Sequence, residues 1–353
     1  MDKKVLAEYG FLMVRPDAFK NNLSNSIYQN IIERGFFLTA AKVLKLTPRQ
    51  FEMIYEQKAH LFVPNLWLFG DIYRNTPCVA MVFKRSTNTD SRPVPEIFDT
   101  IKGNSSPIEG ERKGIREEYG RISSFHGIVH CSDSIEACLN DLQVVFSDYE
   151  LDTILKNEYC LQNKLKSEII HFYLENDENK INSFDIVQFN LYLIKKIIST
   201  LCVRCLTQLD DADLSKFENI FDKYEQISLE VNKISDFSKR KKIFSEFQRD
   251  NKELIDSLIK CPLYFNTDNY KSGINTFETN ALKSDFTLLK LSIAILGAYE
   301  GYNKLDCFKF LSVLERGGVY LTEWQQNILL AALTTDLNAD RYWGGKPCYE
   351  MAK

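Results

Sequence analysis

The sequence Gly127-Ile128-Val129-His130-Cys131-Ser132-Asp133-Ser134 is the stretch from which the fold can be worked out. It begins as an apolar run of strand character and presents a histidine, and Ser132-Asp133-Ser134 then has the composition of a helix N-cap. A histidine at such a joint lies where backbone N–H groups and the helix dipole favour an anion such as phosphate. Imidazole can also carry a phosphoryl group covalently near neutral pH. A lone histidine beside a strand is equally compatible with a structural role, so the preceding segments decide.

The segments before and after this stretch alternate between strand and helix patterns. Apolar runs bounded by turn residues predict strands over residues 10–14, 36–46, 78–83 and 124–130. Apolar residues at helical spacing predict helices over residues 23–34, 95–102 and 135–146, and Thr47-Pro48 is a further helix start. The order βαββαβ predicts a ferredoxin-like α+β domain, an antiparallel sheet with helices on one face.

The remainder of the chain has a helical pattern. No glycine or proline occurs between Val129 and Cys261, which favours long helices. The apolar period predicts helices over residues 151–174, 183–206, 212–231, 235–259, 280–299, 305–315 and 322–334. We therefore expect two domains, an α+β domain over residues 1–150 and an all-α helical domain over residues 151–353.

The composition limits the partners that the chain can have. Its 353 residues carry a net charge of −4, so no basic field favours nucleic acid. No signal-peptide pattern opens the sequence, and the apolar run from Leu288 to Tyr299 is too short to cross a membrane. The nine cysteines lack framework spacing, and the CxxC of residues 202–205 has no second pair nearby, so we expect reduced thiols and no protein-bound metal. These features predict a cytoplasmic protein without membrane or nucleic-acid partners.

Several motifs in the same order resemble the nucleoside diphosphate kinase family across about residues 9–147. The most specific is His130-Cys131-Ser132-Asp133-Ser134-Ile135-Glu136, where the family reads H-G-S-D-S. The others resemble the first strand with its KPD motif, the second strand, the nucleotide-clamping helical hairpin and the third strand: Phe11–Asp17, Gly35–Leu38, Phe62–Leu66 and Pro77–Val82. The resemblance implies the family's α+β fold.

The resemblance also implies a catalytic group. His130 matches the histidine that takes the γ-phosphate of a nucleoside triphosphate and passes it to a diphosphate. Asp141, eleven residues further on, matches the glutamate that holds the imidazole, although its side chain is shorter. Ser132 matches a serine near the phosphohistidine.

The expected nucleotide-binding residues are carried over from the same resemblance. Arg116 matches a phosphate-binding arginine, and Ser105 stands in place of a phosphate-binding threonine. Tyr55 matches a tyrosine near the active-site histidine, and Phe62 a phenylalanine that stacks on the base. Arg15 stands where the family has a lysine that contacts the sugar and phosphate.

Two further departures concern substrate recognition. Asp99 stands where the family has a second phosphate-binding arginine, which reverses a charge; Arg92 and Arg112 are the cations near it in the sequence. Gly127 stands where an asparagine would bind the ribose. These departures imply that phosphate chemistry is retained while sugar recognition is altered.

The resemblance therefore predicts a phosphotransferase that uses nucleoside triphosphates and diphosphates with Mg²⁺, through a covalent phosphohistidine, and assembles as a homo-oligomer. A second hypothesis is a nucleotide-binding sensor or scaffold that no longer turns over, with the helical domain as its effector. A third is a nucleotide-dependent transferase with another phosphoryl acceptor.

Overall fold

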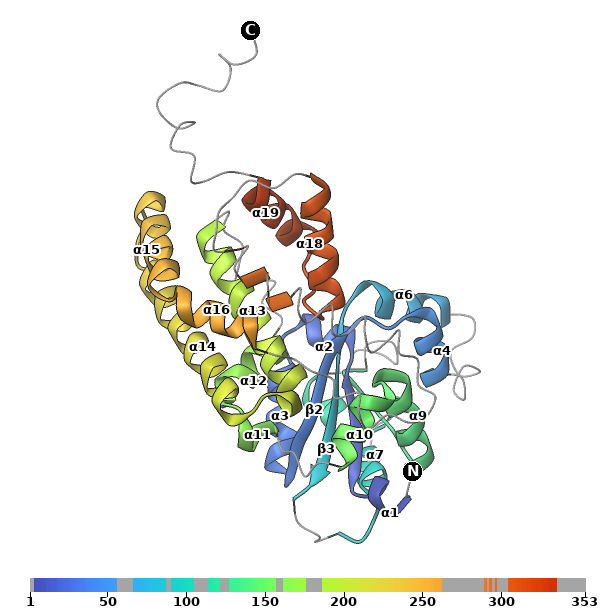
Figure 1. The fold of residues 1–353 in the computed structure, drawn as a ribbon. Helices are drawn as coiled ribbons and strands as arrows, with labels where there is room; N and C mark the ends of the chain where they lie inside the picture. Colours follow the sequence, from blue (N-terminus) through green and yellow to red (C-terminus); the bar gives the residue numbers. More distant parts are fainter. Residues whose placement is uncertain are drawn as a thin grey trace. The chain divides into compact units, whose positions relative to one another are not determined.

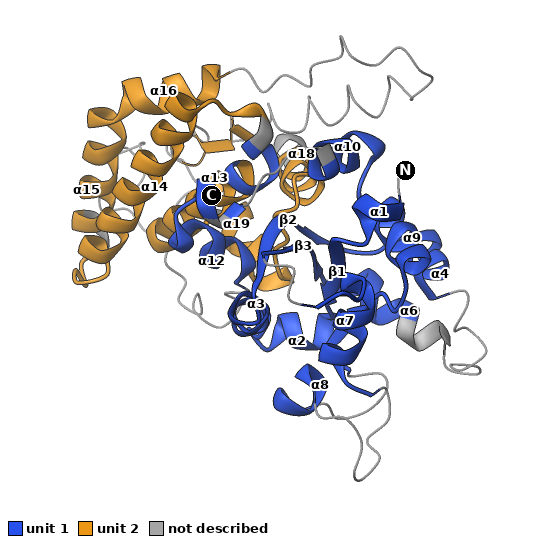
Figure 2. Ribbon diagram, turned by 90° about the horizontal axis from the view of Figure 1, so that it is seen from below, with its two compact units in different colours: residues 1–180, 202–207 blue, residues 181–201, 208–353 orange. Residues whose placement is uncertain are grey.

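The computed structural model describes residues 3–55, 66–86, 90–104, 114–120, 127–156, 161–175, 186–261, 289–290, 292–293, 296 and 304–334. The chain divides into two compact units (Figure 2): residues 1–180 with 202–207 form unit 1, and residues 181–201 with 208–353 form unit 2. The helices that directly follow residue 147 therefore belong to the same unit as the sheet. The division into domains at residue 150 remains a prediction.

Unit 1 contains a four-stranded antiparallel sheet in the order β2-β3-β1-β4. Figure 1 labels its neighbouring strands β2 and β3. The strands are β1 (Tyr9–Val14), β2 (Phe36–Leu44), β3 (Cys78–Arg85) and β4 (Val129–Cys131). The described helices of unit 1 are α1 (Lys3–Leu6), α2 (Pro16–Lys20), α3 (Ser24–Glu33), α4 (Pro48–Tyr55), α6 (Leu66–Asn75), α7 (Val94–Lys102), α8 (Ile115–Glu118), α9 (Ile135–Val145), α10 (Asp148–Lys156), α11 (Leu161–Lys164) and α12 (Ser167–Leu174). Because α3 connects β1 to β2 and α7 lies between β3 and β4, the predicted ferredoxin-like fold is confirmed.

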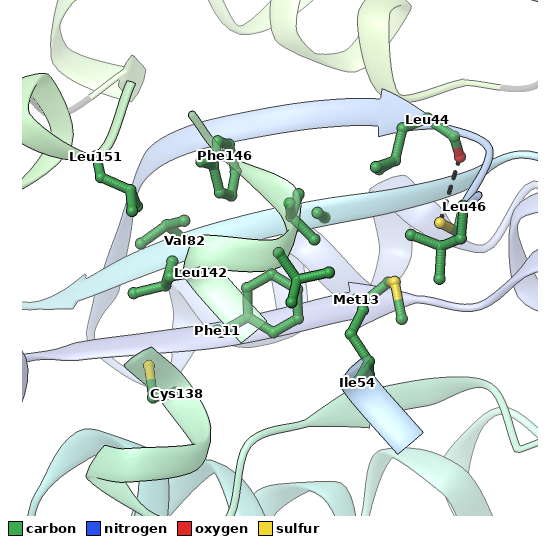
Figure 3. Packing of buried hydrophobic residues seen from close by; sticks show 14 of the residues in the cluster. Phe11, Met13, Leu44, Leu46, Ile54, Val82, Cys138, Leu142, Phe146 and Leu151 are labelled. Atoms are coloured by element: carbon green, nitrogen blue, oxygen red, sulfur yellow. Dashed lines mark hydrogen bonds between the residues drawn. The ribbon is translucent and has the colours of Figure 1, made fainter. Parts of the chain in front are cut away.

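Helices cover both faces of the sheet, so the prediction of helices on one face was wrong. Every residue of β1 is buried, the pattern of a strand enclosed on both sides rather than the alternation of a half-exposed strand. On one face Phe11 and Met13 pack against α4 and α9, in the cluster drawn in Figure 3. On the other face α7 approaches so closely that a Cβ added at Gly10 would lie 2.8 Å from a methyl carbon of Val94. Glycine permits this contact because it has no Cβ.

The helix predicted over residues 151–174 is interrupted. Helices α10, α11 and α12 occupy this part of the chain, and Lys166 has a non-helical backbone (φ −58°, ψ 139°) before α12 begins. The apolar period that suggested one helix is nevertheless buried throughout, at Leu161, Leu165, Ile169 and Ile170. The pattern correctly identified the buried face, although the turns between the helices carry no strong sequence signal.

The described residues of the remainder form helices joined by turns, which confirms the predicted all-α character. Its elements are α13 (Ile186–Cys205), the 3₁₀ turn η3 (Leu206–Gln208), α14 (Asp211–Val231), α15 (Phe237–Asp250), α16 (Lys252–Lys260), α18 (Lys304–Arg316) and α19 (Glu323–Thr334). The helix predicted over residues 235–259 is two helices, which meet at Asn251 (φ −107°, ψ 13°), and the Asn251 side chain donates to the Phe247 carbonyl at 2.9 Å where α15 ends. Most of the helix predicted over residues 280–299 lies outside the described residues.

Among the described residues, α13 is the one helix with the length and apolar composition to cross a bilayer. However, 83% of its apolar segment is buried inside the protein, as in the core helix of a globular fold. Its thiols Cys202 and Cys205 are both reduced and buried.

Candidate active site

Asp141 holds His130 at the centre of the candidate active site. The Nε2 atom of His130 lies 2.8 Å from Asp141 Oδ2, and Ser132 Oγ donates a hydrogen bond to the same oxygen at 2.8 Å. Strand β4 supplies the histidine and helix α9 the aspartate; Ser134 Oγ caps α9 by accepting a hydrogen bond from the Ala137 N–H at 3.2 Å. His130, Ser132 and Asp141 are 7%, 2% and 3% exposed. The structure thus brings the three expected catalytic residues together, and the shorter aspartate reaches the ring.

Aromatic rings pack around the imidazole. The Phe11 ring meets His130 edge-on with centroids 6.2 Å apart, and the Tyr55 ring lies 5.3 Å from it. The Tyr55 hydroxyl lies 2.8 Å from that of Tyr73, in α6, and both tyrosines are buried. Burial raises the pKa of Tyr55 to about 12, so its hydroxyl stays protonated at neutral pH.

Tyr73 also contacts the candidate phosphate ligand Arg15. The Cζ atom of Arg15 lies 6.0 Å from the centroid of the Tyr73 ring, and Arg15 Nε is 3.8 Å from Asp17 Oδ1. Tyr73 therefore links two residues, Arg15 and Tyr55, that the sequence assigned to nucleotide binding. The sequence did not identify Tyr73, because an aromatic residue in an apolar helix has the same pattern as a core residue.

Removing the Tyr73 hydroxyl tests this link. We expect Tyr73→Phe to keep the ring beneath Arg15 but to lower the free energy of unfolding by about 1 kcal/mol through loss of the bond to Tyr55. The phosphorylation of His130 that the resemblance predicts should become slower, because Tyr55 packs on the imidazole. Tyr224→Phe is the matched control, since this buried hydroxyl bonds Gln248 in unit 2. Urea unfolding and the rate of phosphorylation give the two readouts; equal effects of both variants on the rate would contradict the link.

The backbone just before His130 is strained. Ile128 has a φ of 65°, a conformation that β-branched residues rarely adopt and that costs about 1–3 kcal/mol. Neighbouring groups hold it there: its N–H donates to Asp17 Oδ2 at 3.1 Å, and its carbonyl accepts from the Arg15 N–H at 2.9 Å. This turn fixes the direction in which β4 runs and therefore the position of His130.

Arg116 fixes the strand that carries His130. It extends from α8 and is 7% exposed. Its Nε donates to the Gly127 carbonyl at 3.1 Å, and its Nη2 donates to the Val129 carbonyl at 3.0 Å. Strand β4 lies at the edge of the sheet, with β1 on one side. The charge-assisted bonds from Arg116 satisfy carbonyls on its other side. Arg116 therefore lies at the site as expected, and it contacts main-chain oxygens beside His130.

A second cation, Lys102, contacts the residue that follows His130 in the sequence. Its Nζ donates to the Cys131 carbonyl at 3.4 Å and pairs with Asp99 at 2.6 Å. The sequence treated Asp99 as an unexplained charge reversal; its partner is the lysine one helical turn further along α7. Arg92 pairs with Asp90 at 2.7 Å.

Three further residues named from the sequence lie outside the described residues. These are the expected nucleotide ligands Phe62 and Ser105, together with Arg112.

Comparisons with known proteins point to one family. The sequence model of nucleoside diphosphate kinase matches residues 8–151. A nucleoside diphosphate kinase of Persephonella marina is 34% identical over 145 residues, which are 41% of this chain and 96% of that relative. One of Saccharolobus solfataricus is 26% identical over 42% of this chain and 100% of its own length. A solved nucleoside diphosphate kinase from Encephalitozoon cuniculi is 25% identical over 40% of this chain and 90% of that chain, with a TM-score of 0.34.

Fold and site together define a ferredoxin-like α+β domain with a buried histidine–carboxylate pair at its edge strand. Through residues 8–151, the chain belongs to the nucleoside diphosphate kinase family. The helices beyond residue 151 are additional to the region that the family model matches.

Proposed function

We propose that this chain is a nucleoside diphosphate kinase-like phosphotransferase in which His130 carries the γ-phosphoryl group of a nucleoside triphosphate. The acceptor is a nucleoside diphosphate or another phosphoryl acceptor. The observation that carries the proposal is the 2.8 Å contact between His130 Nε2 and Asp141 Oδ2 in a buried site. The family supports it, because the relatives matched over 96% and 100% of their length are both described as nucleoside diphosphate kinases.

In the proposed mechanism Asp141 accepts the Nε2–H of His130, which leaves the lone pair of the ring on Nδ1. Nδ1 attacks the γ-phosphorus; the P–N bond forms as the bond from that phosphorus to the bridging oxygen breaks, and the nucleoside diphosphate leaves with the electron pair. The ring becomes cationic, and Asp141 stabilises the charge through the same N–H. A terminal oxygen of the acceptor then attacks the phosphorus, the P–N bond breaks, and the neutral ring is restored.

The substrate-contacting residues are proposed from the family resemblance and the placement of their neighbours. Arg15 and Arg116 contribute guanidinium groups, whose planar donors match phosphate oxygens. The Arg15 N–H donates to the Ile128 carbonyl, and Arg116 Nη2 donates to the carbonyl of Val129, which precedes His130. The other proposed contacts are hydroxyl and aromatic side chains: Ser132, Tyr55, Ser105 and Phe62.

Magnesium enters this proposal with the nucleotide. Within the described residues, no group of three His, Cys, Asp or Glu side chains is arranged to hold a metal ion. Mg²⁺ commonly keeps several waters and binds through substrate phosphates rather than a protein cage, so the residues present fit a metal that arrives with the triphosphate. When bound, it would neutralise charge on the phosphate oxygens.

The role of Asp141 can be tested directly. We expect Asp141→Asn to slow phosphorylation of His130 by about 10²- to 10⁴-fold, because an amide cannot stabilise the cationic ring and can favour the wrong tautomer. Asp141→Glu should retain most of the rate, because it restores the carboxylate. The measurement is the rate at which the intact protein gains mass with ATP and Mg²⁺. A wild-type rate in Asp141→Asn would contradict the mechanism.

A second candidate is a nucleotide-binding sensor that does not turn over. The charge of Asp99 favours it, because a carboxylate stands where the resemblance places a phosphate-binding arginine. Measurable nucleotide binding without any phosphorylation of His130 would support this function over the first.

The cellular setting is proposed on the same basis. We place the protein in the cytoplasm, with residues 151–353 as a helical domain that modifies the substrate range or couples the reaction to a partner. Assembly into a homo-oligomer follows from the family resemblance.

A further inference from the structure

Strand β2 forms the edge of the sheet opposite β4. Within the described residues it pairs with β3 alone, so its other side carries N–H and C=O groups that have no strand partner. An edge of this kind attracts a further strand, commonly from a second copy of the same chain. In this protein most of β2 is nevertheless buried, at Phe36, Leu38, Thr39, Ala41, Val43 and Leu44.

Helix α3 of the family region contacts β2, and the segment after the family region adds further contacts. Helix α11 packs against β2, and α12 packs against α3. Tyr173, in α12, is 1% exposed, and its hydroxyl accepts a hydrogen bond from the Val43 N–H at 3.0 Å. A backbone donor on the outer side of β2 is thus satisfied by a side chain. His171 adds a second attachment, because its Nε2 lies 2.6 Å from Gln29 Nε2 and its carbonyl accepts from the Asn25 side chain at 3.0 Å.

An ionic cluster links β2 to α10 and to the end of α13. Lys42, in β2, pairs with Glu150 at 3.0 Å and donates to the Val145 carbonyl at 2.9 Å. Arg204, in the last turn of α13, pairs with the other oxygen of Glu150 at 3.0 Å. The side chains of Lys42, Glu150 and Arg204 are 18%, 19% and 8% exposed. All of these residues belong to unit 1, so the cluster is part of the same compact body as the sheet.

From these contacts we infer that residues 161–174 occupy the outer edge of β2 as an internal partner, so that a second copy of this chain does not add a strand there. The family region ends at residue 151, and the covering segment is therefore an addition of this chain to the domain that its relatives share. Any homo-oligomer of this protein uses surfaces other than the β2 edge. The inference does not depend on whether His130 is phosphorylated.

Hydrogen–deuterium exchange with residue resolution tests the inference on the full chain. In the wild type the Val43 amide should exchange slowly, and its rate should be the same at every protein concentration, whatever the degree of association found by sedimentation equilibrium. In Tyr173→Phe the Val43 amide should exchange faster by roughly five- to tenfold, the factor expected for the loss of one ordinary hydrogen bond. This variant keeps the ring and therefore the packing of α12.

Tyr119→Phe is the matched control, because it removes another tyrosine hydroxyl bond of unit 1, from Tyr119 to the Ser26 carbonyl at 3.0 Å. It should leave the exchange of Val43 unchanged. Protection of Val43 that rises with protein concentration would show that a second copy covers the edge and would overturn the inference. Unchanged exchange in Tyr173→Phe, or an equal acceleration in Tyr119→Phe, would overturn it as well.

Discussion

Incubation with ATP and Mg²⁺ is expected to add one phosphoryl group to the wild-type protein and none to His130→Ala. The reason is the geometry of the buried pair: Asp141 binds Nε2 and leaves the Nδ1 lone pair for attack on phosphorus. Alanine removes the only atom of the site that the mechanism uses to form a covalent bond. Intact-mass spectrometry at neutral or alkaline pH measures the gain, before and after nucleoside diphosphates are added.

His171→Ala is the matched control, because this histidine also lies in unit 1 but contacts Gln29 and Tyr28 instead of the site. It should gain the phosphoryl group as the wild type does. A gain that persists in His130→Ala would contradict the assignment of His130. A phosphoryl group on His130 that nucleoside diphosphates do not remove would point to another acceptor. Nucleotide binding without any gain of a phosphoryl group would support the nucleotide-binding sensor instead.

Replacing Glu150 by glutamine is expected to lower the free energy of unfolding by about 3–5 kcal/mol. Glu150 is the single carboxylate that the structure places between Lys42 and Arg204. Without its charge, two cations remain in a largely buried position, and the bond from Lys42 to the neutral Val145 carbonyl does not replace the lost charge. Urea unfolding of the two proteins at neutral pH measures the difference, and Glu168→Gln, an exposed site on α12, is the control.

The same substitution should change how stability depends on pH. Burial by itself raises the pKa of Glu150, but the charges of Lys42 and Arg204 outweigh it and lower the pKa from 4.5 to about 2. A lowered pKa means that the stabilisation, about 3 kcal/mol for such a shift, is complete above pH 4.5 and is lost as the pH falls towards 2. The difference between wild type and Glu150→Gln should therefore shrink across this interval. A constant difference would show that Glu150 is not the titrating group.

Much of the α+β domain was accessible from the sequence because its information is local. Turn residues bound the strands, and the order of motifs defines the topology. The spacing of eleven residues between His130 and Asp141 puts one on a strand and the other two turns into the following helix, where they meet. These features need little knowledge of the rest of the fold.

The remaining features depend on contacts between distant segments. The apolar residues of α11 and α12 predicted burial, but not that they are buried against β2. Tyr73 and Lys102 have the composition of an ordinary core residue and an ordinary helix end, and only their three-dimensional neighbours reveal a place in the site. The coverage of the second sheet face was missed because a uniformly apolar strand does not indicate which helices enclose it.

The strand that carries His130 pairs with β1 over three residues only. Much of what keeps it in place comes from side chains, namely Asp17, Arg116 and Lys102. Short segments held in this way open locally at a lower free energy than the whole domain. Warming or mild denaturant should therefore abolish the proposed phosphorylation of His130 while circular dichroism still reports an intact fold. A preparation can look native and be inactive, so catalytic competence has to be judged at β4 rather than from the global unfolding curve.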